Sequence, residues 1–449
     1  MIDSMPHAPC PMPTPRHLIP LVLIAAMLLL PAAAVGQTKS TFTPRFSVSE
    51  TYDDNIDLEP HNKDSDWITV VSPGGNFQLE SPHSQLTLDY EAGFSFYARD
   101  SSRNTTRHRA LISWDQLVAE HLRLNLSDTF SRSEDPITVE DNRITDISRG
   151  REVQYRNTGE TSMSWQFGAE DQVTAGYRNR LLNSDSAQTE DSRANEGFLN
   201  LSTWFIPKFG IDLTSSFSRW EFQQSKDFTG IPTDDFYQYQ GGLTINYRWQ
   251  PQRIGYVRYS IVYQNYDHEF GDLSSVASED YVVHQPTVGL SLALGPNTNL
   301  GAEFGYFRQE FDHKKGEDGY VFNGSFNTRG ERTTFSILTD TGYSLDYGTS
   351  QNQGFSKYSD SSANVGFQLT ESLNLFATAR YRWEDFTETN RTDHTYGGRA
   401  GLGYAFRHWL SLSLEGGHLR RDSTENDQEF SDNRVTLRIT TSYPIPFGD

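Results

Sequence analysis

Segments of roughly ten residues alternate apolar and polar side chains along most of this chain. In one of them, apolar side chains occupy every second position from Leu86 to Phe96, and polar or small residues stand between them. A period of two predicts a β-strand with one apolar and one polar face. Because such segments recur to the C-terminus, the pattern predicts an all-β fold, a transmembrane antiparallel up-and-down β-barrel.

Short turns alternate with long polar loops between these segments. Outer-membrane barrels have short periplasmic turns and longer outer loops, so we expect the turns in the periplasm and the loops outside. Together they predict about 20 strands, within a range of about 18 to 22, and an even number places both termini in the periplasm. The short turns fall at 81–84, 118–121, 168–171, 206–210, 250–252, 295–298, 329–331, 370–372 and 406–409.

The two ends of the chain have their own signals. Arg16 and His17 precede an apolar core from Leu18 to Leu30 and a small-residue run, which predicts a cleaved signal peptide over 1–36 and a barrel over 37–449. The core is shorter than the roughly 20 residues of a spanning helix. At the other end, prolines after Tyr443 predict that the last strand ends there.

Composition supports a barrel over a helical membrane protein. Hydrophobic residues make up 35% of the 449 residues, and the mean hydropathy is −0.63. Cys10, the only cysteine, precedes the signal core, so the mature chain carries no thiol chemistry. Aromatic residues reach 13%, as interfacial girdles require. The girdle is predicted at Phe130, Tyr177, Phe205, Trp249, Tyr266, Tyr306, Trp383 and Phe406, whereas inward rings such as Tyr97 and Phe376 could instead stack on carbohydrate.

The net charge is −21, and much of the acidic excess falls in the predicted outer loops. Such carboxylates either bind divalent cations at the lipopolysaccharide surface or form a solvated acidic rim, and no spacing matches a calcium-binding loop. The first loop shows the pattern best, with Asp53, Asp54, Asp57, Glu59, Asp64 and Asp66 against a single Lys63.

The polar face of the strands would line the lumen. A barrel of this size is wider than its own side chains can fill, so a water-filled lumen is expected. Alternatively, these charges neutralise one another across neighbouring strands and hold the wall together. The pore-lining candidates are Asp89, Glu91, Arg123, Arg156, Glu160, Arg178, Arg180, Arg248, Arg258, Glu303, Arg380, Arg382, Arg399, Glu415 and Arg438.

Signatures of catalysis are weak. The strand histidines His284, His394 and His418 stand in no trusted pattern with a serine or carboxylate, and the chain has no phosphate-binding loop or nucleophile elbow. We therefore predict that the protein is not an enzyme and has no metal or cofactor.

The start of the predicted mature chain resembles a known family. The run from Tyr52 to Ile56, then Asp64 to Thr69, then Ser72 to Gly74, is similar to the opening of β-barrel porins whose genes often lie in exopolysaccharide-export or protein-sorting loci. The resemblance implies a wide barrel in the outer membrane of a Gram-negative bacterium. It also implies a conduit for polysaccharide or another polar polymer, with a periplasmic export partner.

Three functions remain open at this point. The first is a porin-like conduit for diffusion or export of polar solutes, above all polysaccharide. The second is a structural or adhesive barrel, with a lumen plugged by an inward-folded loop and binding through its acidic outer loops, especially Ser133 to Glu152. The third is a barrel enzyme. The expected partners are outer-membrane lipid and lipopolysaccharide, the barrel-assembly machinery and a periplasmic polysaccharide-export protein, with no role for nucleic acid.

Overall fold

The computed structural model describes residues 38–140, 143–187, 189–224, 233–267, 279–313, 315–347, 349, 354–387 and 389–447. The predicted signal peptide, 1–36, lies outside these residues. Among them, no helix is long and apolar enough to cross a membrane.

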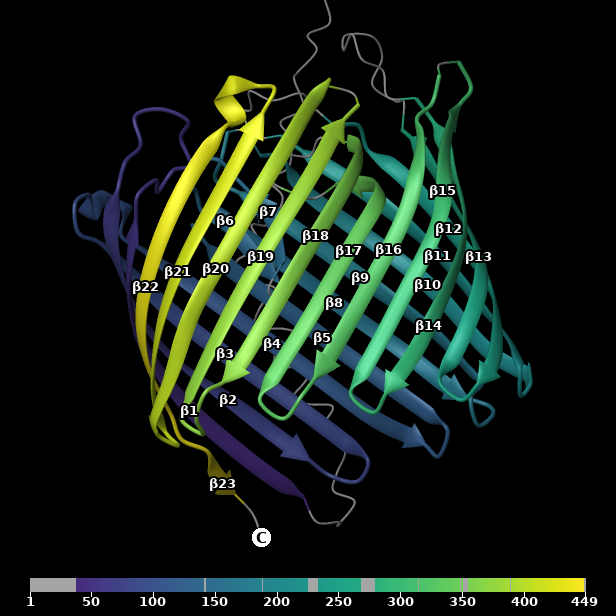
Figure 1. Ribbon diagram of the computed structural model, residues 1–449, viewed down its shortest axis with the longest axis horizontal. Coiled ribbons are helices and arrows are strands. Elements are labelled where there is room, and N and C mark those ends of the chain that lie inside the picture. The colour runs from purple at the N-terminus through teal and green to yellow at the C-terminus, as the bar shows by residue number, and fades with distance from the viewer. Residues whose placement is uncertain are drawn as a thin grey trace, which may run out of the picture.

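Twenty antiparallel strands form a closed barrel (Figure 1), as the alternating pattern predicts. Two 3₁₀ turns, η2 (Ser101–Arg103) and η3 (Asn426–Gln428), lie in the loops at one end. The wall strands are β1 (Lys39–Asp53), β2 (Asp66–Glu80), β3 (Ser84–Tyr97), β4 (Thr105–Ala119), β5 (Leu122–Ser133), β8 (Gln154–Gln166), β9 (Gln172–Ser184), β10 (Asp191–Ile206), β11 (Phe209–Gln223), β12 (Phe236–Gln250), β13 (Arg253–Tyr266), β14 (Tyr281–Gly295), β15 (Thr298–Phe311), β16 (Asp318–Arg329), β17 (Thr333–Asp346), β18 (Gly354–Gln368), β19 (Leu373–Phe386), β20 (Arg391–Arg407), β21 (Leu410–Ser423) and β22 (Phe430–Ser442).

The barrel closes between its first and last strands. β1 pairs with β22 from Arg45↔Ser442 to Asp53↔Arg434, and the short β23 (Ile445–Phe447) extends the same seam. β22 ends one residue before the predicted end at Tyr443. The nine short turns lie together at one end of the barrel and the long connections at the other (Figure 1), which confirms the predicted alternation.

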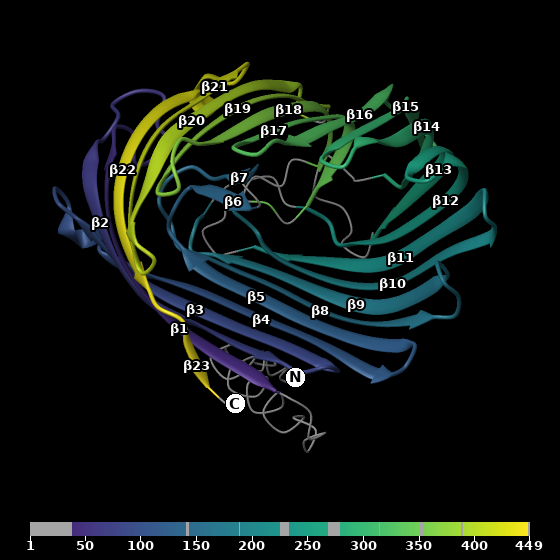
Figure 2. The same ribbon diagram turned by 60° about the horizontal axis from the view of Figure 1, so that its bottom comes forward.

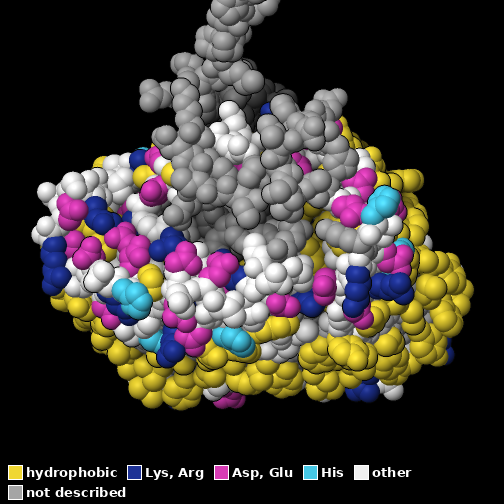
Figure 3. All heavy atoms as spheres, turned by 90° about the horizontal axis from the view of Figure 1, so that it is seen from above, with side chains coloured by type: hydrophobic (Ala, Val, Ile, Leu, Met, Phe, Trp, Pro, Cys, Tyr) yellow, Lys and Arg dark blue, Asp and Glu magenta, His cyan; other side chains and the backbone are white. Residues whose placement is uncertain are grey.

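Alternation along each strand separates a lipid-facing from a lumen-facing surface. In β3, Phe94 and Phe96 are 41% and 48% exposed on the outside, whereas Ser95 and Tyr97 are buried on the inside. Hydrophobic side chains form a belt below the polar outer rim (Figure 3). The belt is the surface that hydrocarbon covers in a membrane-embedded barrel.

The long loop between β5 and β8 turns into the lumen. It contains the hairpin of β6 (Ile137–Glu140) and β7 (Arg143–Ile147), which forms a separate two-stranded sheet inside the ring of wall strands (Figure 2). The prediction that this loop faces outward is therefore wrong, because its two ends form ion pairs with the lumen wall.

The outer ends of β17 and β18 also leave the cylindrical wall. β16 pairs with β17 only as far as Phe322↔Thr341, whereas β17 and β18 pair with each other up to Asp346↔Gly354. The hairpin separates only from β16, since β18 stays paired with β19 as far as Ser356↔Phe386, and its end places Phe355 against Phe307, with ring centroids 6.1 Å apart. It thus contributes to an aromatic cluster inside the lumen.

Candidate functional site: two cavities and a folded-in loop

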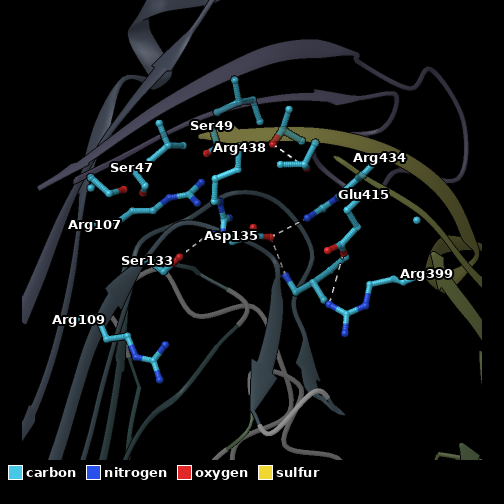
Figure 4. A pocket seen from close by; sticks show the side chains of 18 of the residues that line it. Ser47, Ser49, Arg107, Arg109, Ser133, Asp135, Arg399, Glu415, Arg434 and Arg438 are labelled. Carbon is cyan, nitrogen blue, oxygen red and sulfur yellow. Dashed lines mark hydrogen bonds and ion pairs between the residues drawn. The ribbon is translucent and has the colours of Figure 1, made fainter. Parts of the chain in front are cut away.

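An arginine-rich cavity of about 630 Å³ lies between the in-folded loop and the wall around the β1–β22 seam. Strands β1 to β5 and β19 to β22 line it, together with the first residues of the loop (Figure 4). We call it the arginine cavity. Its lining includes Arg45, Arg109, Arg380, Arg399 and Arg438 against Glu91 and Glu415.

Most of these arginines are neutralised by a neighbour, but two are not. Arg399 lies 3.5 Å from Glu415, and Arg45 donates hydrogen bonds to both carboxylate oxygens of Asp89. Within the part of the chain that the structure describes, no carboxylate lies within ion-pair distance of Arg109 or Arg438. Both side chains are exposed to the cavity, so they are available to an anionic solute.

The two arginines differ in their neighbours. Arg438 stands opposite Ser49 on one side and Ser413 on the other, so small hydroxyl side chains leave its guanidinium uncovered and supply further hydrogen-bond donors and acceptors. Arg109 stands opposite Ser131 on one side and Glu91 on the other, and Glu91 has its ion pair with Arg45, at 3.7 Å.

Ion pairs latch the start and the end of the in-folded loop to the wall. Glu134 lies 2.6 Å from Arg107, and Asp135 lies 3.1 Å from Arg434. Arg151, at the other end of the loop, lies 2.6 Å from Asp53, with both side chains buried. Because breaking a buried pair leaves an uncompensated charge, these contacts hold the loop inside the barrel.

The same arginines set the pKa values of the loop carboxylates. Burial acts to raise the pKa of Glu134, but the charge and hydrogen bonds of Arg107 outweigh it and hold the pKa below its ordinary value. Desolvation acts in the same way on Asp135. Arg434, Arg151 and Arg107 together hold the pKa of Asp135 well below its usual range. Both carboxylates are therefore ionised, and the latch is closed, at neutral pH.

A second cavity, of about 590 Å³, lies on the wall of β8 to β14. Its two carboxylates are each paired with an arginine, since Arg178 lies 2.7 Å from Glu160 and Arg180 lies 2.9 Å from Glu196. The rings of Phe198 and Tyr343 also reach it. We call it the neutral cavity, because the rest of its lining is mainly hydroxyl and amide groups, namely Ser162, Thr174, Asn200, Thr214, Ser215, Ser216, Gln240, Ser260 and Gln285.

An aromatic cluster fills the outer part of the lumen above the neutral cavity. Phe236 and Phe307 are 0% and 1% exposed, and fully buried Gln264 donates hydrogen bonds to the hydroxyls of Tyr266 and Tyr347, at 2.7 and 2.8 Å. Tyr266 belongs to this cluster, so its predicted place in the lipid-facing girdle is wrong. The sequence pattern places Tyr266 near a strand end. In β13 it lies two positions after buried Gln264, so its side chain is on the same, inward face of the strand.

The fifteen predicted lumen residues fall into separate groups, and their role in the pore stays a prediction. Arg438 is the one among them for which the described residues hold no ion pair. Five line the arginine cavity (Glu91, Arg380, Arg399, Glu415 and Arg438), and two line the neutral cavity (Glu160 and Arg178). The rest form ion pairs: Asp89 with Arg45, Arg123 with Asp115, Arg156 with Asp146 of the in-folded hairpin, Arg180 with Glu196, Arg248 with Glu170, Arg258 with Glu303, and Arg382 with Glu384.

Sequence reasoning missed Arg107, Arg109 and Arg434. In β4, Ala110, Leu111 and Ile112 are consecutive apolar residues, so the alternation does not indicate which face of this strand is the polar, lumen-facing one. The spacing of Arg107 and Arg109 by two was the available signal.

In the described residues, the carboxylates of the acidic first loop, 53–66, form neither a rim exposed only to solvent nor a cluster that could bind a cation. Asp57 lies 2.7 Å from Arg103, and Asp53 is held by Arg151 and Arg434. No cluster of metal-ligating side chains occurs among the residues that the structure describes. These carboxylates instead pair with arginines that bind the loops and strand ends together.

The barrel is similar to several solved outer-membrane structures at low identity. OccK2 (OpdF) of Pseudomonas aeruginosa is 14% identical, with 91% of this chain and 98% of that chain covered and a TM-score of 0.43. OpdK of the same organism is 13% identical, with coverages of 90% and 99% and a TM-score of 0.43. OccAB4 of Acinetobacter baumannii is 12% identical, with coverages of 91% and 98% and a TM-score of 0.39.

No curated protein sequence matches the chain. A family match, in contrast, extends over residues 31–443 and therefore over nearly all of the barrel. The chain belongs to the outer-membrane porin family described as "Putative beta-barrel porin 2".

Proposed function

We propose that this porin is a conduit for polar solutes and that acidic saccharides are the solutes it passes best. The observation that carries the proposal is the pair of exposed arginines, Arg109 and Arg438, which have no carboxylate within ion-pair distance among the described residues and face a cavity whose lining includes several serines (Figure 4). Guanidinium groups form charge-assisted, often bidentate, hydrogen bonds with carboxylates, which favours anions in this part of the lumen.

The neutral cavity supports saccharides over other anions. Hydroxyl and amide side chains such as Asn200, Gln240 and Gln285 can donate and accept hydrogen bonds, as sugar hydroxyls require. A ring such as Phe198 offers an apolar face against which a sugar can stack. A solute that carries both carboxylates and hydroxyls suits the two cavities together.

If the acidic saccharide is a polymer, the proposal becomes one of polysaccharide export. It would need a periplasmic export partner that delivers the chain to the end with the short turns, and an in-folded loop that gives way during passage. We assign no catalytic role.

Single-channel recording tests the proposal. The refolded barrel, in a planar bilayer with a salt gradient, should give stable openings that favour anions. An oligosaccharide of uronic acids should then block the current at lower concentration than a neutral oligosaccharide of the same length. Cation-selective openings, or equal block by both oligosaccharides, would contradict the proposal. A barrel that inserts but stays silent would favour the plugged-lumen alternative, which the in-folded loop makes a specific competitor.

A further inference from the structure

Two groups of three side chains repeat one arrangement on the lipid-facing side of the wall, near the outer rim. In each, a tyrosine lies on one strand, a histidine is the fourth residue of the next strand, and an arginine stands directly opposite that histidine on the third strand. We call them Tyr–His–Arg triads. They are Tyr90, His108 and Arg132 on β3 to β5, and Tyr259, His284 and Arg308 on β13 to β15.

The tyrosine orients the histidine in the same way in both triads. The Tyr90 hydroxyl lies 2.9 Å from Nδ1 of His108, and the Tyr259 hydroxyl lies 2.7 Å from Nδ1 of His284. In each pair the rings also stack, at 23° and 28°. When the hydroxyl donates to Nδ1, the neutral imidazole carries its proton on Nε2 and presents it away from the tyrosine.

The second triad faces outward into the lipid boundary. Val283 and Phe307, the residues beside its histidine and arginine, are buried in the lumen at 0% and 1% exposure, so His284 and Arg308 lie on the opposite face. The Arg308 side chain is 66% exposed, with its Nε 3.0 Å from Glu310. Histidines lie beside lysine or arginine side chains on the rim above the hydrophobic belt (Figure 3).

Physical chemistry places these groups at the level of the lipid headgroups. An imidazole N–H without an acceptor, or an ion pair such as Arg308–Glu310, would be costly in hydrocarbon. Only Nε of Arg308 contacts Glu310, so headgroup phosphates can accept from its terminal guanidinium nitrogens and from the histidine Nε2–H, and arginine binds phosphate with paired hydrogen bonds. The chain has a net charge of −21, so basic pairs on its outer surface stand out. Two lipid-facing histidine–arginine pairs in the same register are therefore candidate sites for an anion.

We propose that each Tyr–His–Arg triad binds a phosphate group of lipopolysaccharide in the outer leaflet. The arginine contributes the charge, the histidine Nε2–H contributes a second donor, and the tyrosine fixes the imidazole. The triad of Arg308 is the more open, because Arg132 also donates to Thr106 and Tyr155. The inference is independent of what passes through the lumen.

A third tyrosine–histidine pair supplies a comparison within the same barrel. The Tyr381 hydroxyl lies 3.0 Å from Nδ1 of His394, but Asp422, and not an arginine, stands opposite this histidine. Arg420 donates to Asp422 as Arg308 does to Glu310, so the difference lies in the residue opposite the histidine, which is a carboxylate here and a guanidinium in the triads. This pair should therefore bind phosphate more weakly than the two triads.

Native mass spectrometry of the refolded barrel in detergent tests the proposal, with bisphosphorylated lipid A as the probe. The double variant His284→Gln with Arg308→Gln should bind it roughly tenfold more weakly at one site, the loss expected for a charge-assisted hydrogen bond. Adding His108→Gln and Arg132→Gln should remove the second site. Tyr259→Phe, which keeps the ring and removes the hydroxyl, should give a smaller loss. The matched control is Arg407→Gln with His408→Gln, an exposed pair in a short turn at the other end of the barrel, which should bind like the parent.

Four outcomes would overturn the proposal. The first is equal binding by the parent and the triad variants. The second is equal binding of fully dephosphorylated lipid A, which would mean that acyl chains alone hold the lipid. The third is equally effective competition by inorganic phosphate, which would indicate a site for the free ion. A shift in oligomeric state in the triad variants would likewise assign the surface to a contact between barrels. Heat-dependent gel migration verifies folding, and unchanged conductance separates this result from the conduit proposal.

Discussion

The two sides of the lumen are built from the same alternating strands and yet differ in what fills them. Around the β1–β22 seam, inward side chains are mainly charged or small, with a few aliphatic residues such as Ile68, Val70 and Leu419, and they leave a cavity of about 630 Å³. Around β12 to β18, inward side chains near the outer end are aromatic, and Phe236, Val283, Phe307 and Phe355 are 0 to 1% exposed.

The difference shows that strand number sets the width of a barrel, whereas side-chain identity on one face decides which part stays open. Apolar side chains that face the lumen would otherwise meet water, so their clustering is driven by the hydrophobic effect. The aromatic side therefore contributes stability and restricts the water path. The arginine side leaves charge exposed to solutes, which is the requirement for selectivity.

The largest expected effect is on stability, at the aromatic side. Phe307→Ala should lower the free energy of unfolding by about 3–5 kcal/mol, because it opens a cavity among packed rings. Phe304 on the same strand is the matched control, since it is 55% exposed on the lipid face and Phe304→Ala should cost much less. Urea unfolding in lipid vesicles measures both. Equal losses would mean that the lumen cluster is no more important than a lipid contact.

Removal of the in-folded hairpin should have the next largest effect. Replacing residues 137–147 by a short Gly–Ser linker should raise single-channel conductance roughly twofold, because the barrel is wider than its wall side chains can fill. Replacing the short turn at 370–372, at the other end of the barrel, by Gly–Ser residues is the control, and it should leave conductance unchanged. An unchanged conductance in the hairpin variant would show that the aromatic side alone limits the current.

The sequence predicts the wall better than its contents, for a physical reason. Alternation decides which residues share a face, and this was sufficient for the strand count, the turns and the closing strand. It does not say how distant residues meet inside the ring. The latch joins Glu134 to Arg107 and Asp135 to Arg434, pairs separated by 27 and 299 positions. Tyr266 was misplaced for a related reason, since an aromatic residue near a strand end suits either a girdle or a lumen cluster.

Selectivity should change at the arginine side by a smaller factor. Arg109→Gln with Arg438→Gln removes two lumen arginines that have no carboxylate within ion-pair distance among the described residues, and should reduce the anion-to-cation permeability ratio several-fold. Arg399→Gln with Glu415→Gln is the control, because it removes a neutral pair 3.5 Å apart and should leave the ratio nearly unchanged. Reversal potentials in a salt gradient measure both. If the control shifted the ratio as much as the test variant, local pairing would not determine selectivity.

The smallest effect is expected from mild acid. The pKa values of Glu134 and Asp135 are held below the ordinary carboxyl value of about 4, so the energy that latches the loop is fully present above that value. It is lost only as the pH falls through the depressed pKa values. Conductance should therefore stay constant from neutral pH to about pH 5 and rise toward that of the hairpin-deleted barrel only in stronger acid. Glu134→Gln with Asp135→Asn imitates the protonated latch and should show the raised conductance already at neutral pH. A transition centred between about pH 5 and 7 in the parent would show that a different group controls the loop, such as Asp432, the second carboxylate that binds Arg434.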